Sequence, residues 1–273
     1  MSSQKKNVKR VTAVDIAKRK GGQKVVAQVA YHSSVTKIID RHCDWILVGD
    51  SLGMNLLGMD TTVPVTLDAM IQQGQAVMRA TENALIVVDM PFGSYEESPQ
   101  QAFRNAARIM KETEAGAIKM EGGAHMADTV AFLVQRGIPV MGHIGLTPQA
   151  VNAMGGFRVQ GKAEGADEIL MADVKAVSEA GAFAIVIEGV VEPVARQMTE
   201  SIPTVTIGIG GSLACDGQIL LFDDLMGIND WVPKFVRKFA NLRQDIDAAA
   251  AAYREAVLDG SFPSKDETYE IKK

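Results

Sequence analysis

The sequence has few cysteines and no long apolar run, and each absence excludes a class of protein. Its two cysteines, Cys43 and Cys215, lie far apart and lack the spacing of a metal site. We therefore expect no disulfide framework and infer a reducing, cytoplasmic setting. No apolar stretch of about 18 residues occurs, so no membrane-spanning helix is expected.

An excess of positive charge is also missing. The 28 lysines and arginines are outnumbered by 33 acidic residues, which argues against nucleic-acid binding as the main role. Basic side chains crowd the first 24 residues, but no apolar stretch follows the first of them as it does in a secretory signal. A GxGxxG fingerprint after an early strand is lacking too, which disfavours a dinucleotide-binding protein.

Short apolar runs alternate with helical patterns along most of the chain. The run 46–49 is typical of a strand buried on both faces of a parallel sheet, and it leads directly into Asp50 and Ser51. Ser98 followed by Pro99 marks the start of a helix. The same pattern predicts strands at 24–31, 45–49, 84–88, 117–120, 139–141, 183–187, 204–207 and 219–222.

About eight strands that alternate with helices predict a parallel α/β fold, and the length fits a closed barrel better than an open sheet. No linker divides the chain. We therefore predict a single (β/α)8 barrel of the TIM type with extra N- and C-terminal helices. The predicted segments are a basic tail and short helix at 1–23, the catalytic barrel with its C-terminal helices at 24–263, and a polar tail at 264–273.

Ionisable side chains occur at or near most of the predicted strand ends, which is where (β/α)8 barrels build their active sites. Taken singly, Asp50 or Ser51 is more often a helix cap, and His143 is more often a hydrogen-bonded core histidine. Lys119 is more unusual, since a lysine inside a strand needs an acidic partner. The candidates at this end of the barrel are Asp50, Ser51, Asp89, Lys119, Glu121, His143, Glu188 and the glycine-rich turn 208–212.

Carboxylates that converge on one end of a barrel repel one another unless a cation lies between them. The available ligands are oxygen donors, a set that favours Mg²⁺ over a structural zinc. A 2-keto acid can chelate such an ion, which then stabilises the charge of an enolate. Glu188, after the apolar run 184–187, is the best candidate for the base. The residues thus predict metal-assisted enolisation without identifying the electrophile.

Five motifs occur in order, with a spacing that resembles that of the ketopantoate hydroxymethyltransferase family. The likeness extends over about residues 24–263, and the order of the motifs makes it specific although each one alone is weak. The motifs are VGDSLG at 48–53, DMPF at 89–92, KMEGG at 119–123, GHIGLTPQ at 142–149 and DGQ at 216–218.

This resemblance implies a (β/α)8 enzyme of pantothenate and coenzyme A synthesis. Such an enzyme transfers a hydroxymethyl group from 5,10-methylenetetrahydrofolate to 3-methyl-2-oxobutanoate and gives 2-dehydropantoate, with Glu188 as proton acceptor. A homo-oligomer is also implied, in the form of a large ring-like assembly, a decamer. The implied ligands are Asp50, Asp89 and Glu121 for Mg²⁺, and Asp50, Ser51, Asp89, Lys119 and His143 for the keto acid.

The chain departs from the family pattern at His32, Ser212 and Asp223, where an acid, a glycine and a histidine, respectively, are usual. These positions lie outside the predicted metal and base residues. They concern the positioning of folate and the closure of loops.

Three alternatives stay open on the sequence. One is a metal-dependent carbon–carbon lyase or phosphonate-forming enzyme, which a reactive cysteine would favour, although Cys215 lacks basic neighbours. Another is a phosphate-binding barrel enzyme, because the turn 208–212 follows a late strand; the same glycines equally suit close packing. The third is a non-catalytic binding protein that keeps the barrel and a ligand.

Overall fold

The computed structural model describes residues 9–269, whose contacts divide them into two compact units with the boundary between Leu221 and Phe222. This boundary falls inside the segment 24–263 that the sequence analysis treated as one domain. This division by contacts does not test the predicted domain bounds, which stay a prediction. Each unit is described separately.

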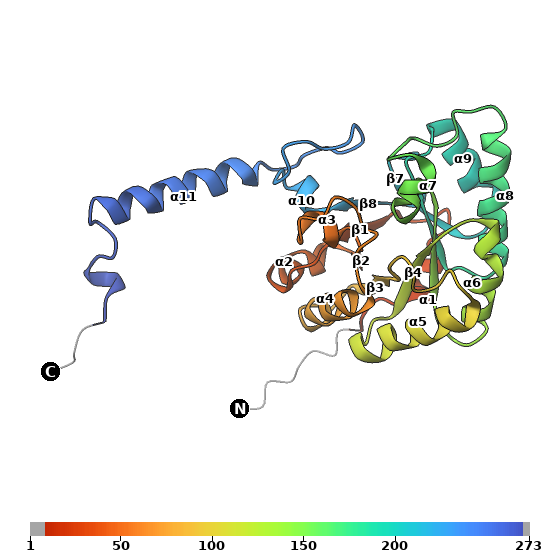
Figure 1. The fold of residues 1–273 in the computed structure, drawn as a ribbon, viewed down its shortest axis with the longest axis horizontal. Helices are drawn as coiled ribbons and strands as arrows, with labels where there is room; N and C mark the ends of the chain where they lie inside the picture. Colours follow the sequence, from red (N-terminus) through yellow and green to blue (C-terminus); the bar gives the residue numbers. More distant parts are fainter. Residues whose placement is uncertain (1–8, 270–273) are drawn as a thin grey trace. The chain divides into compact units, whose positions relative to one another are not determined.

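Eight parallel strands of the first unit close into a barrel in the order β1 to β8, and β8 pairs with β1 (Figure 1). The predicted (β/α)8 fold is thereby confirmed. Every residue of β2, β3, β4 and β5 is buried, as expected for strands covered on both faces. The strands are β1 (Val25–Val29), β2 (Trp45–Val48), β3 (Leu85–Asp89), β4 (Ala117–Glu121), β5 (Val140–Gly145), β6 (Ala184–Glu188), β7 (Val205–Ile209) and β8 (Gly217–Leu221).

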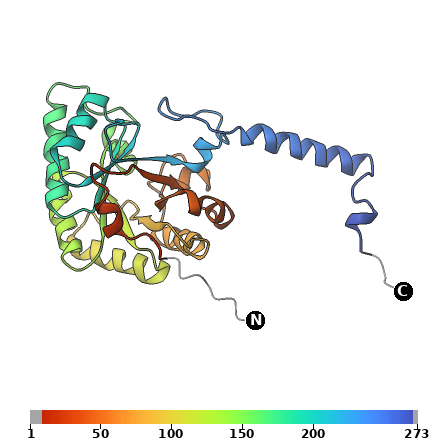
Figure 2. The same ribbon diagram turned by 180° about the vertical axis from the view of Figure 1, so that it is seen from behind.

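Helices cover the outside of the barrel (Figures 1 and 2). Ser98 accepts a hydrogen bond from the backbone of Gln101 and is followed by Pro99, so the predicted helix start is confirmed. The α-helices of this unit are α1 (Ala13–Ala17), α2 (Ser33–Ile39), α3 (Leu52–Asn55), α4 (Leu67–Arg79), α5 (Pro99–Thr113), α6 (Ala127–Val134), α7 (Val151–Met154), α8 (Ala166–Glu179) and α9 (Glu192–Ser201), with 3-10 turns η1 (Asp40–His42), η2 (Ala124–Met126) and η3 (Pro148–Ala150).

Several strands extend further than their apolar runs. Asp89, Glu121 and Glu188 are the last residues of β3, β4 and β6, where residues just past the ends were predicted. His143 was expected after a strand ending at residue 141, but it lies inside β5. These residues still pair with the neighbouring strands, and their polar side chains contact one another inside the barrel. The end of an apolar run therefore does not mark the end of the strand.

The strict alternation of strand and helix ends after β7. Residues 210–216 connect β7 to β8 without a helix. At the N-terminal end of the barrel, the Asp216 carboxylate accepts hydrogen bonds from the backbone of Gly21 and Thr206 and pairs with Lys20. Residues 20–21, which precede β1, are therefore hydrogen-bonded to Asp216, directly before β8, the strand that closes the barrel.

The second unit contains α10 (Phe222–Leu225), α11 (Leu242–Leu258) and the 3-10 turn η4 (Lys265–Glu267). Helix α11 is one of the predicted C-terminal helices, and none of its residues is buried. Across residues 9–269, no helix combines the length and the apolar character that a membrane crossing requires.

Candidate active site

The ionisable residues predicted from the strand ends form a connected cluster at the C-terminal end of the barrel. Their side chains come from β3 to β6 and from the residues directly after β2. The cluster is mostly buried: Asp50, Asp89, Lys119, Glu121 and His143 are each at most 5% exposed, whereas the Glu188 side chain is 18% exposed.

Asp89 connects two neighbours in this cluster. Its Oδ1 lies 2.8 Å from Lys119 Nζ, and its Oδ2 accepts a hydrogen bond of 3.1 Å from the backbone N–H of Asp50. Lys119 thus has the acidic partner that its position inside a strand required. Parallel pairing of β3 with β4 places Asp89 opposite Lys119 and produces this contact.

His143 occupies the centre of the second half of the cluster. Its Nδ1 lies 3.3 Å from Glu121 Oε1 and 3.1 Å from Lys119 Nζ, while its Nε2 lies 3.2 Å from Glu188 Oε2. The register of β4 and β5 pairs Glu121 with His143. His143 is thus a buried histidine whose partners are all ionisable residues of the cluster.

Burial and charge change the acidities of these groups strongly. Burial, together with the charges of Asp89 and Glu121, raises the pKa of Asp50 to about 8, and burial also raises the pKa of Asp89. Burial and Lys119 oppose a charge on His143, but Glu121 and Glu188 outweigh them and raise its pKa to about 9. The carboxylates are close enough to repel one another, so a bound cation would stabilise their ionised forms.

Ser51 follows Asp50 and is half-buried. It occupies the N-cap position of α3 without making a capping hydrogen bond. Its Oγ instead lies 2.6 Å from the hydroxyl of Tyr31, which follows β1. The cap interpretation of this turn is therefore wrong for the Ser51 side chain, and Asp50 donates its backbone N–H to Asp89 without capping a helix.

The sequence reasoning missed two residues of the cluster. Tyr95, in the loop after β3, accepts a hydrogen bond from the backbone N–H of Glu121 and donates one to Gln149 Oε1. Gln149 donates from Nε2 to Asp50 Oδ2 at 2.8 Å and to the carbonyl of Met90 at 2.9 Å. Gln149 belongs to the motif at 142–149 but was given no role, and nothing in the sequence singles out Tyr95.

The donor set of the cluster fits Mg²⁺. Asp50 Oδ1 accepts no hydrogen bond from any described residue and is the unengaged carboxylate oxygen beside Asp89 and Glu121. No three His, Cys, Asp or Glu side chains within 9–269 are grouped so as to enclose a metal by themselves. That arrangement agrees with magnesium, which uses one or two carboxylates and completes its octahedron with water and substrate oxygens.

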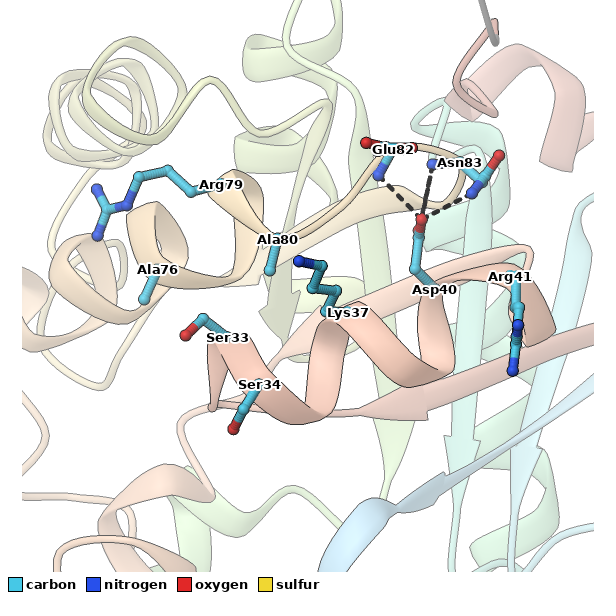
Figure 3. Close-up of a pocket in the computed structure, with 10 residues that line it drawn as sticks. All are labelled: Ser33, Ser34, Lys37, Asp40, Arg41, Ala76, Arg79, Ala80, Glu82 and Asn83. Atoms are coloured by element: carbon cyan, nitrogen blue, oxygen red, sulfur yellow. Dashed lines mark hydrogen bonds between the residues drawn. The ribbon is translucent and has the colours of Figure 1, made fainter. Parts of the chain in front are cut away.

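A hollow of about 660 Å³ lies elsewhere, between α2 and α4 (Figure 3). It contains none of the predicted site residues. The Asp40 carboxylate in its wall already accepts hydrogen bonds from the backbone of Glu82, Asn83 and Ala84. The Asp40 carboxylate thus stabilises the turn at residues 82–84, and the predicted site residues lie inside the barrel instead.

Two alternatives lose their structural basis. Cys215 is fully buried next to Asp216, at the end of the barrel opposite the cluster. A Cβ on Gly208 would lie 2.8 Å from the Gln218 side chain, so this glycine allows close packing. Ser212 donates a hydrogen bond to the Glu192 carboxylate, an acidic neighbour that disfavours a phosphate at this turn.

The fold and the cluster together define a (β/α)8-barrel enzyme whose charged site lies at the C-terminal ends of the strands. The family model described as ketopantoate hydroxymethyltransferase matches residues 10–265. A 3-methyl-2-oxobutanoate hydroxymethyltransferase of Bartonella quintana (strain Toulouse) is 54% identical over 265 residues, which cover 97% of this chain and 96% of that protein. The chain belongs to the ketopantoate hydroxymethyltransferase family, and it is an enzyme of the hydroxymethyltransferase class.

Solved structures with the same fold include proteins of the alternative class. A phosphonomutase-like protein of Burkholderia cenocepacia J2315 has a TM-score of 0.63 and 13% identity, over 90% of this chain and all of that one. 2,3-Dimethylmalate lyase, of the PEP mutase/isocitrate lyase superfamily, has a TM-score of 0.58 and 15% identity, over 94% of this chain and 91% of that one. These likenesses show the barrel alone, whereas the sequence relationship shows the family.

Proposed function

We propose that this enzyme transfers the one-carbon unit of 5,10-methylenetetrahydrofolate to 3-methyl-2-oxobutanoate, through an enolate that Glu188 forms as the base. The observation that carries this proposal is the position of Glu188. Its carboxylate is partly exposed at the barrel opening, whereas the other acids are buried beneath it among Lys119 and His143. The least buried acid is the one best placed to meet a proton of a bound substrate.

The oxygen donors support Mg²⁺ as the cofactor, bound directly through the free Oδ1 of Asp50 and held by Asp89 and Glu121 directly or through water. Bound there, the ion would stabilise negative charge on the keto oxygen of the substrate. Lys119 and Ser51 would orient the keto acid, with His143 at its edge. Lys119 remains charged, because its acidic neighbours outweigh burial and raise its pKa, so it suits a substrate carboxylate.

The reaction then needs few further groups. Glu188 accepts the C3 proton, and the electrons of the broken C–H bond form the enolate. The C3 carbon attacks the methylene carbon of the folate donor and forms the new C–C bond. One C–N bond of the donor breaks as this C–C bond forms, and the nitrogen released takes the proton from Glu188. Water then displaces the second folate nitrogen from the same carbon and supplies the hydroxyl group. That nitrogen takes a proton of the water, and tetrahydrofolate and 2-dehydropantoate are released. His143 stays beside the Glu188 carboxylate and keeps it in place throughout.

We also propose that the enzyme acts in the cytoplasm as a ring-like homo-oligomer, a decamer. The 54% identity to a member of the family supports this proposal. Sedimentation velocity of the purified full chain tests it, and a monomer at micromolar concentration would contradict it.

The decisive experiment is proton NMR of 3-methyl-2-oxobutanoate in D2O with enzyme and Mg²⁺ but without folate. We expect the C3 proton signal to disappear, and we expect EDTA and the Glu188→Gln variant each to prevent this exchange. Addition of the folate donor should then give 2-dehydropantoate. If no exchange occurs with or without folate and no product forms, the proposed reaction is wrong.

A further inference from the structure

Both the oxygen and the nitrogen of the Gln149 side-chain amide make hydrogen bonds inside the cluster. Its Oε1 accepts from the Tyr95 hydroxyl at 2.5 Å, and its Nε2 donates to Asp50 Oδ2 and to the Met90 carbonyl. Its backbone N–H donates to Glu121 Oε2 at 3.0 Å. One residue that is 5% exposed therefore contacts groups that follow or belong to three neighbouring strands, β2, β3 and β4.

The orientation of this amide is fixed by its partners. The Met90 carbonyl can only accept, so Nε2 must face it. Tyr95 already accepts a hydrogen bond from the Glu121 backbone, so its own proton is directed to Gln149 Oε1. The three hydrogen bonds therefore form one chain of donors and acceptors. The Glu121 N–H donates to the Tyr95 hydroxyl, which donates to Gln149 Oε1, and Gln149 Nε2 in turn donates to Asp50.

These hydrogen bonds hold one oxygen of each of the two acids, Asp50 and Glu121. Asp50 is held through Oδ2, which leaves Oδ1 without a partner among the described residues. Glu121 is held through Oε2 by Gln149, while its Oε1 faces His143. Carboxylates that bind metals are usually held in this way by surrounding groups, which set the direction of the free lone pairs.

We propose that Gln149 is a positioning residue whose side chain orients Asp50 for the metal and the keto acid, and that Tyr95 supports it; its backbone N–H holds Glu121, and this contact is kept when the side chain is replaced. This inference rests on the proposed function. Gln149 touches the acids and not the reacting atoms, so it acts through them. A merely structural role would predict a loss of stability when Gln149 is replaced, with no specific effect on the metal.

The test is the affinity of metal-free enzyme for Mn²⁺, measured by electron paramagnetic resonance, together with the C3 exchange rate at saturating keto acid. Gln149→Met keeps a similar length and removes both the donor and the acceptor. We expect its Kd for Mn²⁺ to rise by about 10- to 100-fold, the range typical for groups that support metal ligands. Tyr95→Phe retains the amide and should raise this Kd by a smaller factor.

Leu133→Ala provides the matched control, because Leu133 is fully buried on α6 and contacts no residue of the proposed metal set in hydrogen bonds or ion pairs. It should lower the melting temperature and leave the Mn²⁺ affinity within about a factor of two of wild type. Should Gln149→Met prevent folding, Tyr95→Phe decides the matter. An unchanged Mn²⁺ affinity in the folded Gln149→Met variant, or in Tyr95→Phe alone when the former does not fold, overturns the inference.

The wild-type enzyme separates this result from a failure of the proposed function. If wild type neither binds Mn²⁺ nor exchanges the C3 proton, the proposed metal-assisted reaction fails. If wild type does both and the variants match it in metal affinity, only the role of Gln149 fails.

Discussion

His143 Nε2 lies 3.2 Å from Glu188 Oε2, so the carboxylate proposed as the base is paired with a buried imidazole. Glu121, on the other side of the ring, helps to raise the pKa of His143 to about 9 against the effect of burial. The two neighbouring carboxylates thus favour the protonated imidazole, whereas burial and Lys119 oppose it. The imidazole holds the Glu188 side chain in one orientation, and Glu188 is the proposed acceptor of the substrate proton.

Replacing His143 should impair the positioning of Glu188. We expect His143→Gln to lower the rate of C3 proton exchange by about 10- to 100-fold, because a base displaced by about 1 Å loses a factor of this size. The Mg²⁺ affinity should change less than this rate. Exchange kinetics at saturating keto acid provide the measurement. A variant that exchanges the proton as fast as wild type would show that the pair does not position the base.

Lys119→Met should change metal binding and turnover in opposite directions. Lys119 lies 2.8 Å from Asp89, and the same acids that raise its pKa are the proposed metal ligands. Removal of its charge leaves more negative potential for Mg²⁺, so we expect the metal to bind at least about tenfold more tightly. Turnover should nevertheless be lost, because the keto acid loses its cationic partner.

Isothermal titration with Mg²⁺ and a product assay measure these two effects on the same preparation. Lys111→Met is a suitable control, since Lys111 lies on the exposed side of α5, away from the cluster, and should change neither quantity. Weaker Mg²⁺ binding in Lys119→Met would contradict the proposed metal position next to Asp89.

The sequence was sufficient to predict the barrel and most of the cluster. Buried parallel strands appear as apolar runs, and the fold brings their C-terminal ends together wherever those runs occur. Asp50, Asp89 and Glu188 could therefore be placed at one site from their positions alone. Lys119 was informative for a different reason, because a lysine in an apolar strand requires an acidic partner.

Contacts that depend on loops could not be predicted in this way. Tyr95 lies in an irregular loop and reaches the cluster only because that loop folds back over the end of β4. Gln149 was visible in a motif, but its hydrogen bonds depend on the 3-10 turn that follows β5.

Asp216 should stabilise the barrel in a pH-dependent manner. Although burial opposes it, hydrogen bonds from the backbone of Gly21 and Thr206 and the contact with Lys20 lower the pKa of Asp216 below its ordinary value of 3.8. A carboxyl group with a lowered pKa in the folded state stabilises the protein above its unfolded pKa, and this contribution disappears as the pH falls through the folded value. We expect Asp216→Asn to lower the free energy of unfolding by about 2 kcal/mol at neutral pH.

Urea unfolding followed by Trp45 fluorescence, in a Trp231→Phe background, reports on the barrel because Trp45 is fully buried in β2. The difference between wild type and Asp216→Asn should shrink on acidification below about pH 4. Asp68→Asn, at an exposed ion pair with Arg108, should change little at any pH. A difference that stays constant with pH would mean that the Asp216 charge is not what stabilises the barrel.

Gly74 should mark a tight contact between α4 and α5. A Cβ at this position would lie 2.8 Å from Thr113 Cγ2, which is too close without movement of one helix. We expect Gly74→Ala to lower the free energy of unfolding by about 1–3 kcal/mol, although alanine favours a helix by about 1 kcal/mol over glycine. Thr113→Ser removes the offending methyl group and keeps the hydroxyl that donates to the Ile109 carbonyl. In the double variant the cost of Gly74→Ala should therefore become smaller, although the contact with Thr113 Cβ at 3.3 Å remains. A cycle of urea unfolding measurements that finds additive effects instead would show that the methyl group is not the obstacle.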